Sequence, residues 1–247
     1  MILKIENLSV SFGDFKALKG VNLEINQGEI FCLMGESGSG KSTLLYSVLG
    51  LLKSARLEGS IKFKDLELTK LSEKDLRQIR GSKISMVFQE PSLYFDPLYK
   101  VGTQIEETYI SHFGKNGARD KALKALERAG LKEPLKVFNS YPHQLSGGQR
   151  QRAFIAMAIV CDPELILADE PTTALDATLQ IKILNLFKSL SKDGKSVLIV
   201  THDPEVALAV SDRVGIMKDG QIVEEGPAGK VLKNPEHPYT AKLLSAL

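Results

Sequence analysis

The sequence predicts an α/β protein with a mainly parallel sheet and helices on both faces, an N-terminal antiparallel β subdomain and a helical insertion. Three observations support this fold class. Short apolar runs, typical of buried parallel strands, alternate with helical segments in the first and last thirds of the chain. A glycine-rich loop directly follows one of these runs, at residue 35. The segment from about 90 to 155 is instead dominated by helix-forming residues.

The first third of the chain starts with β-like segments separated by turn residues. Gly13-Asp14 lies between the first two of these segments, and Gly28 precedes a short, continuous apolar run that is typical of a buried strand. The elements expected here are, in order, strands at 3–10, 17–25 and 29–34, a helix at 42–52 and a further β segment at 56–68.

The middle and last thirds differ in pattern. A helix is expected at 115–131, where Gly130 and Pro134 mark its end, and Lys218-Asp219-Gly220 predicts a hairpin. The other expected elements are strands at 165–168, 196–200, 214–217 and 221–224, and helices at 175–190 and 204–211. We expect one domain over 1–247, with core and β subdomain at about 1–89 and 156–247 and a helical subdomain at about 90–155.

Composition narrows the class of protein. The 247 residues are 43% hydrophobic and 25% charged, and the formal net charge is +2, which disfavours a nucleic-acid binder that works by broad charge neutralisation. Cys32 and Cys161 do not form a disulfide framework or a metal cluster, so we expect two reduced, largely buried thiols. No apolar run approaches the ~18 residues of a membrane span, so a soluble protein is expected, with any membrane role through a partner.

The glycine-rich loop matches the phosphate-binding pattern G-x-x-x-x-G-K-[ST] and lies between a strand and a helix. The glycines allow successive backbone N–H groups to point at phosphate oxygens, and the helix N-terminus adds its positive end. Lys41 supplies a charge for the β and γ phosphates and Ser42 a hydroxyl for Mg²⁺. A chance match in a turn is disfavoured by the strand–loop–helix context. The loop residues are Gly35, Glu36, Ser37, Gly38, Ser39, Gly40, Lys41, Ser42 and Thr43.

Two adjacent acids end the apolar run at 165–168. Neighbouring carboxylates repel each other and need a cation or a proton. We expect Asp169 to hold Mg²⁺, directly or through water, and Glu170 to act as the general base or to position the attacking water. The alternative is a pair of acids in a solvated turn before the next helix.

Three further features precede or follow predicted elements. Gln89 ends the run 84–88 and His202 follows the run 197–201, so both lie at strand ends, although a lone histidine there is more often structural. Ser146, Gly147, Gly148 and Gln149 open a helical stretch, which makes either a second anion site or an ordinary serine N-cap.

Together, the LSGGQ segment at 145–149, the phosphate loop and the LILADEP segment at 165–171 resemble the ATP-binding cassette (ABC) ATPases over essentially the whole chain. The resemblance implies a P-loop NTPase core that binds ATP and Mg²⁺ and hydrolyses ATP. In that family the signature segment of one subunit caps the ATP on the phosphate loop of another. The implied partners are a second ABC ATPase subunit, as homodimer or heterodimer, two membrane permease subunits and, indirectly, a solute-binding protein, at the cytoplasmic face of the membrane.

The resemblance also implies roles for single residues. Phe12 stands where the family has an aromatic ring, more often tyrosine, that stacks on adenine. Gln89 matches a glutamine that contacts Mg²⁺ and water and faces the transporter. Asp176, in Ala174-Leu175-Asp176, matches a segment that links the two ATP sites. His202 matches a histidine that contacts the γ phosphate.

Within the family, three segments resemble the importers of peptides and nickel: 80–84, 88–97 and the tail Asn234-Pro235-Glu236-His237-Pro238-Tyr239-Thr240. Many peptide-type members continue into a longer cysteine-bearing extension, whereas this sequence ends at Leu247, so peptides and chelated metals such as nickel both stay open as solutes. The alternatives are a lipoprotein-type exporter ATPase, a non-transport ABC ATPase and a regulatory P-loop module that does not hydrolyse ATP.

Overall fold

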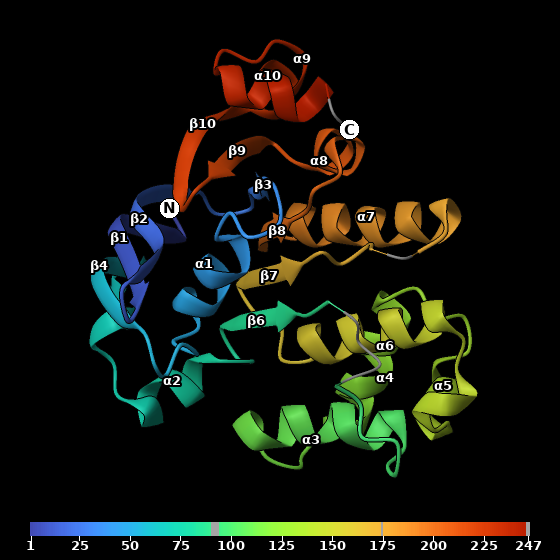
Figure 1. Ribbon diagram of the computed structural model, residues 1–247. Helices are drawn as coiled ribbons and strands as arrows, with labels where there is room; N and C mark the ends of the chain where they lie inside the picture. The colour runs from blue at the N-terminus through green and yellow to red at the C-terminus, as the bar shows by residue number, and fades with distance from the viewer. Residues whose placement is uncertain (90–93, 174, 246–247) are drawn as a thin grey trace. The chain divides into compact units, whose positions relative to one another are not determined.

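The computed structural model describes residues 1–89, 94–173 and 175–245 (Figure 1). The chain divides into two compact units. Unit 1 contains residues 1–76 and 190–247, and unit 2 contains residues 77–189. Helix α2 (Glu73–Ile79) and helix α7 (Ala177–Lys192) each cross the boundary between the units in sequence.

Unit 1 begins with an antiparallel sheet of order β2-β1-β4-β5. Inward-facing residues of β1, among them Leu3, Ile5 and Val10, are buried, as the alternation of apolar and polar residues predicts. The strands are β1 (Leu3–Phe12), β2 (Phe15–Ile25), β4 (Arg56–Phe63) and β5 (Leu66–Glu67). This sheet is the predicted N-terminal β subdomain.

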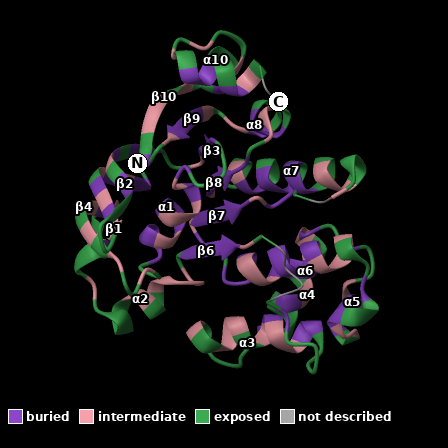
Figure 2. Ribbon diagram, viewed as in Figure 1, coloured by how far each residue is buried: buried purple, intermediate pink, exposed green. Residues whose placement is uncertain are grey.

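The other strands of unit 1 have the order β10-β9-β3-β8. Strand β3 (Ile30–Met34) pairs in parallel with β8 (Ser196–Val200) and β9 (Arg213–Lys218), and β10 (Gln221–Pro227) returns antiparallel to β9. Every residue of β3 and β8 is buried, which is why both read as continuous apolar runs (Figure 2).

Short helices complete unit 1. Helix α1 follows β3 directly, and α8 follows β8, so each starts at the carboxyl end of a parallel strand. The helices are α1 (Lys41–Val48), η1 (Leu68–Lys70), α8 (Pro204–Val210), α9 (Ala228–Lys233) and α10 (Pro238–Ser245).

Unit 2 contains two parallel strands, β6 (Ile84–Val87) and β7 (Leu165–Asp169), and a group of helices between them in sequence. The strands are buried, while the helices bury one face and expose the other (Figure 2). The helices are α3 (Val101–Phe113), α4 (Ala118–Arg128), α5 (Pro134–Asn139), η3 (Pro142–Gln144) and α6 (Gly147–Ile159).

The structure confirms the predicted fold class and the order of the predicted elements. Two predicted helices differ from the structure by more than two residues at an end. The helix expected at 42–52 ends at Val48, because Gly50 adopts a left-handed conformation. The helix expected at 115–131 spans only Ala118–Arg128, and it starts after Gly117, which adopts a left-handed conformation. Helices α9 and α10 were not expected, since both are short. The subdomain boundaries near 90 and 155 stay a prediction.

Over residues 1–89, 94–173 and 175–245, we find no helix with both the length and the apolar character that a membrane span requires.

Gly102, in α3, allows a close contact inside unit 2. A Cβ atom there would lie 2.2 Å from Cγ of Phe138. We therefore expect Gly102→Ala to lower the free energy of unfolding by about 1–3 kcal/mol through overpacking. Urea denaturation monitored by circular dichroism would measure this loss.

The matched control is Gly229→Ala, also in a helix, where a Cβ atom meets no atom within 4 Å. It should cause no loss of stability. Equal effects of the two substitutions would contradict the packing described for Gly102.

Candidate functional site

The phosphate loop starts where β3 ends, and its first glycine is required by contact with β9. A Cβ atom on Gly35 would lie 2.2 Å from the carbonyl oxygen of Met217 and 2.9 Å from Oγ of Ser39. No side chain fits there without moving backbone. At the other end of the loop, a Cβ atom on Gly40 would lie 2.9 Å from the carbonyl oxygen of Ala17. The loop is therefore packed against neighbouring backbone at both ends.

Lys41 is folded back onto the loop. Its ammonium group donates hydrogen bonds to the carbonyl oxygens of Gly35 (2.8 Å) and Glu36 (2.7 Å), and a longer one to Oγ of Ser39 (3.4 Å). Only 7% of Lys41 is exposed. A buried ammonium needs such acceptors, and phosphate oxygens are stronger ones. Lys41 is thus placed where its ammonium group can give up its hydrogen bonds to backbone carbonyls and bind an anion instead.

The loop leads into the N-terminus of α1, with Gly40 as the N-cap residue in a left-handed conformation. Glu36, Ser37 and Gly38 are exposed, and Ser42 and Thr43 are half-buried in the first helical turn. The unpaired N–H groups of such a turn and its positive dipole end attract anions. The loop therefore offers an accessible site for phosphate.

A hairpin turn holds the middle of the loop, which the sequence did not reveal. The N–H of Gly220 donates to the carbonyl oxygen of Ser39 (2.9 Å), and the carbonyl oxygen of Gly220 accepts from the N–H of Lys19 (2.9 Å). A Cβ atom on Gly220 would lie 2.5 Å from the carbonyl oxygen of Ala17. The Lys218-Asp219-Gly220 signal predicted the turn, but not its contact with the loop.

Two other predicted site residues belong to unit 1. Phe12 ends β1 opposite Phe15, and 38% of its surface is exposed, so its ring is available for stacking. His202 is exposed and follows Thr201, whose N–H donates to the carbonyl oxygen of Leu33 (3.2 Å). His202 therefore lies after a strand that is parallel to β3 and next to it.

The two acids lie in unit 2, at the end of β7. Asp169 is buried, with 5% of its surface exposed. Glu170 has φ 45°, a conformation that is uncommon for residues other than glycine and that concentrates at functional sites. Its Oε2 accepts hydrogen bonds from Nε2 of Gln89 (3.3 Å) and Oγ1 of Thr173 (2.9 Å). The structure thus brings Gln89 and Glu170 together, at the ends of the neighbouring parallel strands β6 and β7.

A hydrogen bond from Gln151 fixes the turn after Glu170. This residue of α6 is 5% exposed, and its Nε2 donates to the carbonyl oxygen of Pro171 (2.7 Å). Neither Gln151 nor Thr173 was predicted as a site residue. Thr173 was detectable in principle, since a hydroxyl three residues after an acid is within local reach. The contact of Gln151 is long-range and has no local signal.

The signature residues form the start of α6. Ser146 is the N-cap: its Oγ accepts from the N–H of Gln149 (3.3 Å), and the side chain of Gln149 accepts from the N–H of Ser146 (3.0 Å). Ser146 and Gly147 are exposed, whereas a Cβ atom on Gly148 would lie 2.3 Å from Cδ2 of Leu179. The serine is an N-cap, as the plainer interpretation held, and the helix start is also open to a ligand.

Asp176 caps α7 in unit 2, because its Oδ1 accepts from the N–H of Leu179 (2.9 Å). Ala174, in the same predicted segment, lies outside the described residues, as do Glu90 and Pro91. The two cysteines are buried, and burial raises the pKa of the Cys161 thiol to about 11 and that of Cys32 further still. Both thiols are therefore protonated at neutral pH, and their burial was expected.

The fold and the glycine-rich loop define the class of protein, a P-loop ATPase. The family model described as "ABC transporter" matches residues 18–173. The chain belongs to the ABC transporter family, and it is an ATP-binding and ATP-hydrolysing subunit.

Curated relatives match along the whole chain. The "Dipeptide transport ATP-binding protein DppD" of Bacillus subtilis (strain 168) is 43% identical over 256 residues, which cover 100% of this chain and 76% of that protein. The "Oligopeptide transport ATP-binding protein OppD" of the same organism is 41% identical, with 100% and 72% covered. The "Oligopeptide transport ATP-binding protein AmiE" of Streptococcus pneumoniae serotype 4 is 44% identical, with 94% and 67% covered.

Solved structures agree with the fold. A dimeric bacterial ABC transporter cassette superposes with a TM-score of 0.81 at 38% identity, and covers 92% of this chain and 99% of that one. The same cassette in a post-hydrolysis state with ADP and Pi gives a TM-score of 0.80 at 38% identity, with the same coverage.

The hairpin contact with the loop leads to a test. Gly220→Ala adds a Cβ atom against the carbonyl oxygen of Ala17, so we expect a cost of about 1–3 kcal/mol from overpacking in addition to the strain of a left-handed alanine. If distortion of the phosphate loop accounts for about 1.4 kcal/mol of this cost, the Kd for ATP rises about tenfold. Isothermal titration with ATP would measure this change.

Gly194→Ala is the matched control. Gly194 has φ 84° and Gly220 has φ 81°, but a Cβ atom on Gly194 meets nothing within 4 Å. This variant should lose only about 1–2 kcal/mol of stability and keep its affinity for ATP. An unchanged Kd for Gly220→Ala would show that the hairpin does not hold the loop.

Proposed function

We propose that this chain is the ATPase subunit of an importer for dipeptides or oligopeptides. The observation that carries the proposal is the similarity over 94–100% of this chain, at 41–44% identity, to three relatives that are named for peptide transport. The tail segment 234–240, which resembles that of peptide and nickel importers, points the same way. A nickel chelate as the solute is supported only by the resemblance of segments 80–84, 88–97 and 234–240 to peptide and nickel importers, and it is one of the outcomes of the test below.

The proposed assembly contains a second ABC ATPase subunit, two membrane permease subunits and, indirectly, a solute-binding protein. The chain would lie peripherally, at the cytoplasmic face of the membrane. The dimeric state of the similar cassette supports the second subunit. So does the exposed start of α6 at Ser146 and Gly147, which offers N–H groups and a positive dipole end to an anion held by another subunit.

We propose that ATP binds through its phosphates to the loop of unit 1. The N–H groups of residues 35–43 surround the phosphate oxygens, and the ring of Phe12 stacks on adenine. Lys41 leaves the carbonyl oxygens of Gly35 and Glu36 and pairs with the β and γ phosphates, since a charge-assisted bond to an anion is stronger than one to a neutral carbonyl. His202 contacts the γ phosphate.

We propose that Glu170 takes the proton of the attacking water. Its carboxylate is oriented by the hydrogen bonds from Gln89 and Thr173, and the Gln151–Pro171 bond fixes the turn that carries it. In the assembled pair, Ser146, Gly147, Gly148 and Gln149 of one subunit complete the ATP site of the other, and Asp176 links the two sites.

Mg²⁺ fits the donors of this chain. Ser42, Gln89 and Asp169 supply hydroxyl, amide and carboxylate oxygens, the hard ligands that Mg²⁺ prefers. Within the described ranges, no group of three or more His, Cys, Asp or Glu side chains could hold a metal. We propose that these residues hold the ion together with nucleotide phosphates, whose charge it neutralises when bound.

Glu170→Gln tests the catalytic role. We expect turnover to fall by at least about 100-fold, the lower end of what a general base contributes, while the Kd for ATP stays within about twofold. Phosphate release would measure turnover, and titration with ATP would measure binding. Because hydrolysis reopens the pair, this variant should also elute as a dimer with ATP in size-exclusion chromatography.

Glu164→Gln is the control, since Glu164 is also in unit 2 and pairs with Lys83 (3.4 Å) on the surface. Its turnover should match that of the unmodified protein. Substantial ATP hydrolysis by the Glu170→Gln variant would show that Glu170 is not the general base.

Asp169→Asn tests the metal site. Replacing one charged ligand by a neutral amide should raise the Mg²⁺ concentration for half-maximal ATPase activity by about tenfold or more, consistent with a loss of at least 1.4 kcal/mol. Asp162→Asn, at an exposed residue that pairs with Arg128 (3.3 Å), is the control. A magnesium dependence that is the same in both variants would contradict the role of Asp169.

The solute is identified by purifying the native membrane complex with its solute-binding protein. Mass spectrometry of the bound solute, together with ATPase stimulation by defined di- and oligopeptides, should show peptides. Bound nickel chelate, or no stimulation by any peptide-loaded binding protein, would overturn the peptide assignment and leave the ATPase activity intact.

A further inference from the structure

Gln151 is a buried amide that joins two parts of unit 2 that are far apart in sequence. It lies in α6, only 5% of its surface is exposed, and its Nε2 donates to the carbonyl oxygen of Pro171 (2.7 Å). A buried amide costs free energy unless it is hydrogen-bonded, so this side chain is held to its partner. Pro171 directly follows Glu170, and the bond therefore fixes the backbone one residue beyond the proposed base.

The backbone at Glu170 has little freedom to move by itself. Its φ is 45°, an uncommon value for a residue other than glycine, and the residue before a proline is sterically restricted. The ring of Pro171 in turn fixes the φ of the residue that follows Glu170. A displacement of the Pro171 carbonyl is therefore passed on to Glu170, because the bonds between the two residues cannot absorb it.

The same end of α6 packs against the start of α7. A Cβ atom on Gly148 would lie 2.3 Å from Cδ2 of Leu179. Leu179 belongs to the first turn of α7, where its N–H donates to Oδ1 of Asp176 (2.9 Å). The turn after Glu170 and the start of α7 thus both contact the first five residues of α6, Gly147–Gln151.

The start of α6 is also where the ATP of the second subunit is proposed to bind. Ser146 and Gly147 are exposed, and a Cβ atom on Gly147 would meet no atom within 4 Å. Gln151 lies about 7.5 Å further along the helix axis, at a rise of about 1.5 Å per residue. Over this short distance the hydrogen-bonded helix is a rigid element, so a ligand that fixes Ser146 also fixes the position of Gln151.

We propose that Gln151 is a positioning residue that makes the orientation of Glu170 depend on the ATP held by the second subunit. This inference rests on the proposed function, in which Glu170 acts on the ATP of its own chain while the α6 start caps the other ATP. Binding of that other ATP fixes α6, and Gln151 then holds the turn that carries Glu170 through the carbonyl of Pro171. Each ATP thereby prepares the base that acts on the other one.

Mixed pairs of two full-length copies test this dependence. One copy carries Glu170→Gln and its own affinity tag, so that only the other copy hydrolyses ATP. In this hydrolysing copy, Gln151→Met keeps the side-chain volume and removes the amide, and we expect kcat to fall by about tenfold or more, as the loss of one buried hydrogen bond would cause. The Kd for ATP and the ATP-dependent pairing should stay within about twofold, because the bond acts on the base and not on nucleotide binding.

Ser146→Ala in the hydrolysing copy gives a readout that a merely structural role of Gln151 would not produce. The substitution weakens the contact with the ATP that the other copy holds and does not hydrolyse. We nevertheless expect the kcat of the hydrolysing copy to fall by up to about tenfold. Combined with Gln151→Met it should add little, because both substitutions break the same connection.

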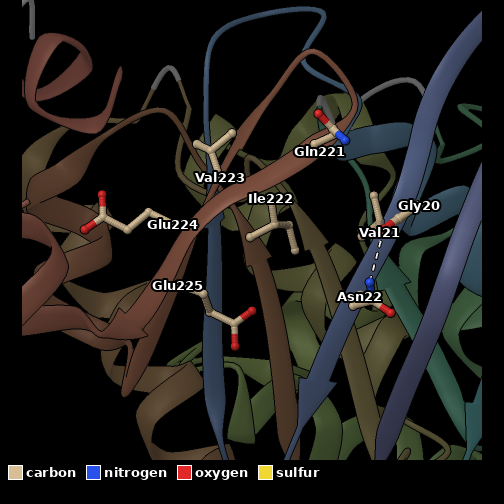
Figure 3. A pocket seen from close by; sticks show the side chains of 8 residues that line it. All are labelled: Gly20, Val21, Asn22, Gln221, Ile222, Val223, Glu224 and Glu225. Carbon is tan, nitrogen blue, oxygen red and sulfur yellow. Dashed lines mark hydrogen bonds between the residues drawn. The ribbon is translucent and has the colours of Figure 1, made fainter. Parts of the chain in front are cut away.

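Asn22→Leu is the control for the loss of an amide. Asn22 lies beside the open hollow between β2 and β10 of unit 1, and its Nδ2 donates to the carbonyl oxygen of Gly20 (3.2 Å) (Figure 3). This bond is exposed and touches no residue assigned to the ATP site, so the kcat of the pair should equal that of the unmodified pair.

An unchanged kcat for Gln151→Met would overturn the inference. So would an equal loss when the substitution is placed in the Glu170→Gln copy, because Gln151 would then act on the capping of the other ATP and not on its own Glu170. Fully additive effects of Ser146→Ala and Gln151→Met, or the absence of an ATP-dependent pair of copies, would also overturn it. If Gln151→Met does not fold, Gln151→Asn, which keeps the amide but shortens its reach by one methylene, takes its place.

The proposed function would survive all of these results, since it also allows a second ATPase subunit of a different kind. It fails on other outcomes, namely ATP hydrolysis by pairs in which both copies carry Glu170→Gln, or a solute that is not a peptide.

Discussion

The contact between Gly35 and the carbonyl of Met217 is the constraint on which the phosphate-binding unit depends. Parallel pairing of β3 with β9 sets Leu33 opposite Gly215 and Met34 opposite Ile216. Gly35, the first residue after β3, must therefore pass directly over the backbone of Met217. Only glycine allows this passage. The chain can then turn into α1, and the β9–β10 hairpin is close enough to bind Ser39. The loop is thus shaped by strand register as much as by its own residues.

In unit 2, a strained backbone conformation at Glu170 positions the functional carboxylate, whereas in unit 1 close packing of Gly35 positions the loop. Glu170 adopts a left-handed conformation that costs of order 1–3 kcal/mol for such residues, and the bonds from Thr173 and from Gln151 to the next residue hold it there. A relaxed backbone at this position would direct the carboxylate elsewhere. Loop and carboxylate therefore use different means, steric exclusion and side-chain hydrogen bonds, to fix a functional group at the end of a strand.

Much of the fold could be predicted, because its signals are local. Buried parallel strands appear as apolar runs, and the loop has a fixed spacing of glycines, so β3, the loop and α1 followed from residues close together in sequence. The contacts of Gly220 with Ser39 and of Gln151 with Pro171 were not predicted. Each joins residues that are far apart in sequence, and nothing in either segment indicates the other.

Lys41 has a consequence for how the protein changes its nucleotides. Its ammonium group donates hydrogen bonds to two carbonyl oxygens of the loop, and under the proposed role of Lys41 these oxygens compete for it with the phosphates of the nucleotide. The contribution of Lys41 to the affinity for nucleotide is then the difference in free energy between its bonds to phosphate and its bonds to these carbonyl oxygens. Under the proposed role of Lys41, its ammonium group therefore has hydrogen-bond acceptors both with and without nucleotide, and the exchange of partners leaves no buried charge unsatisfied.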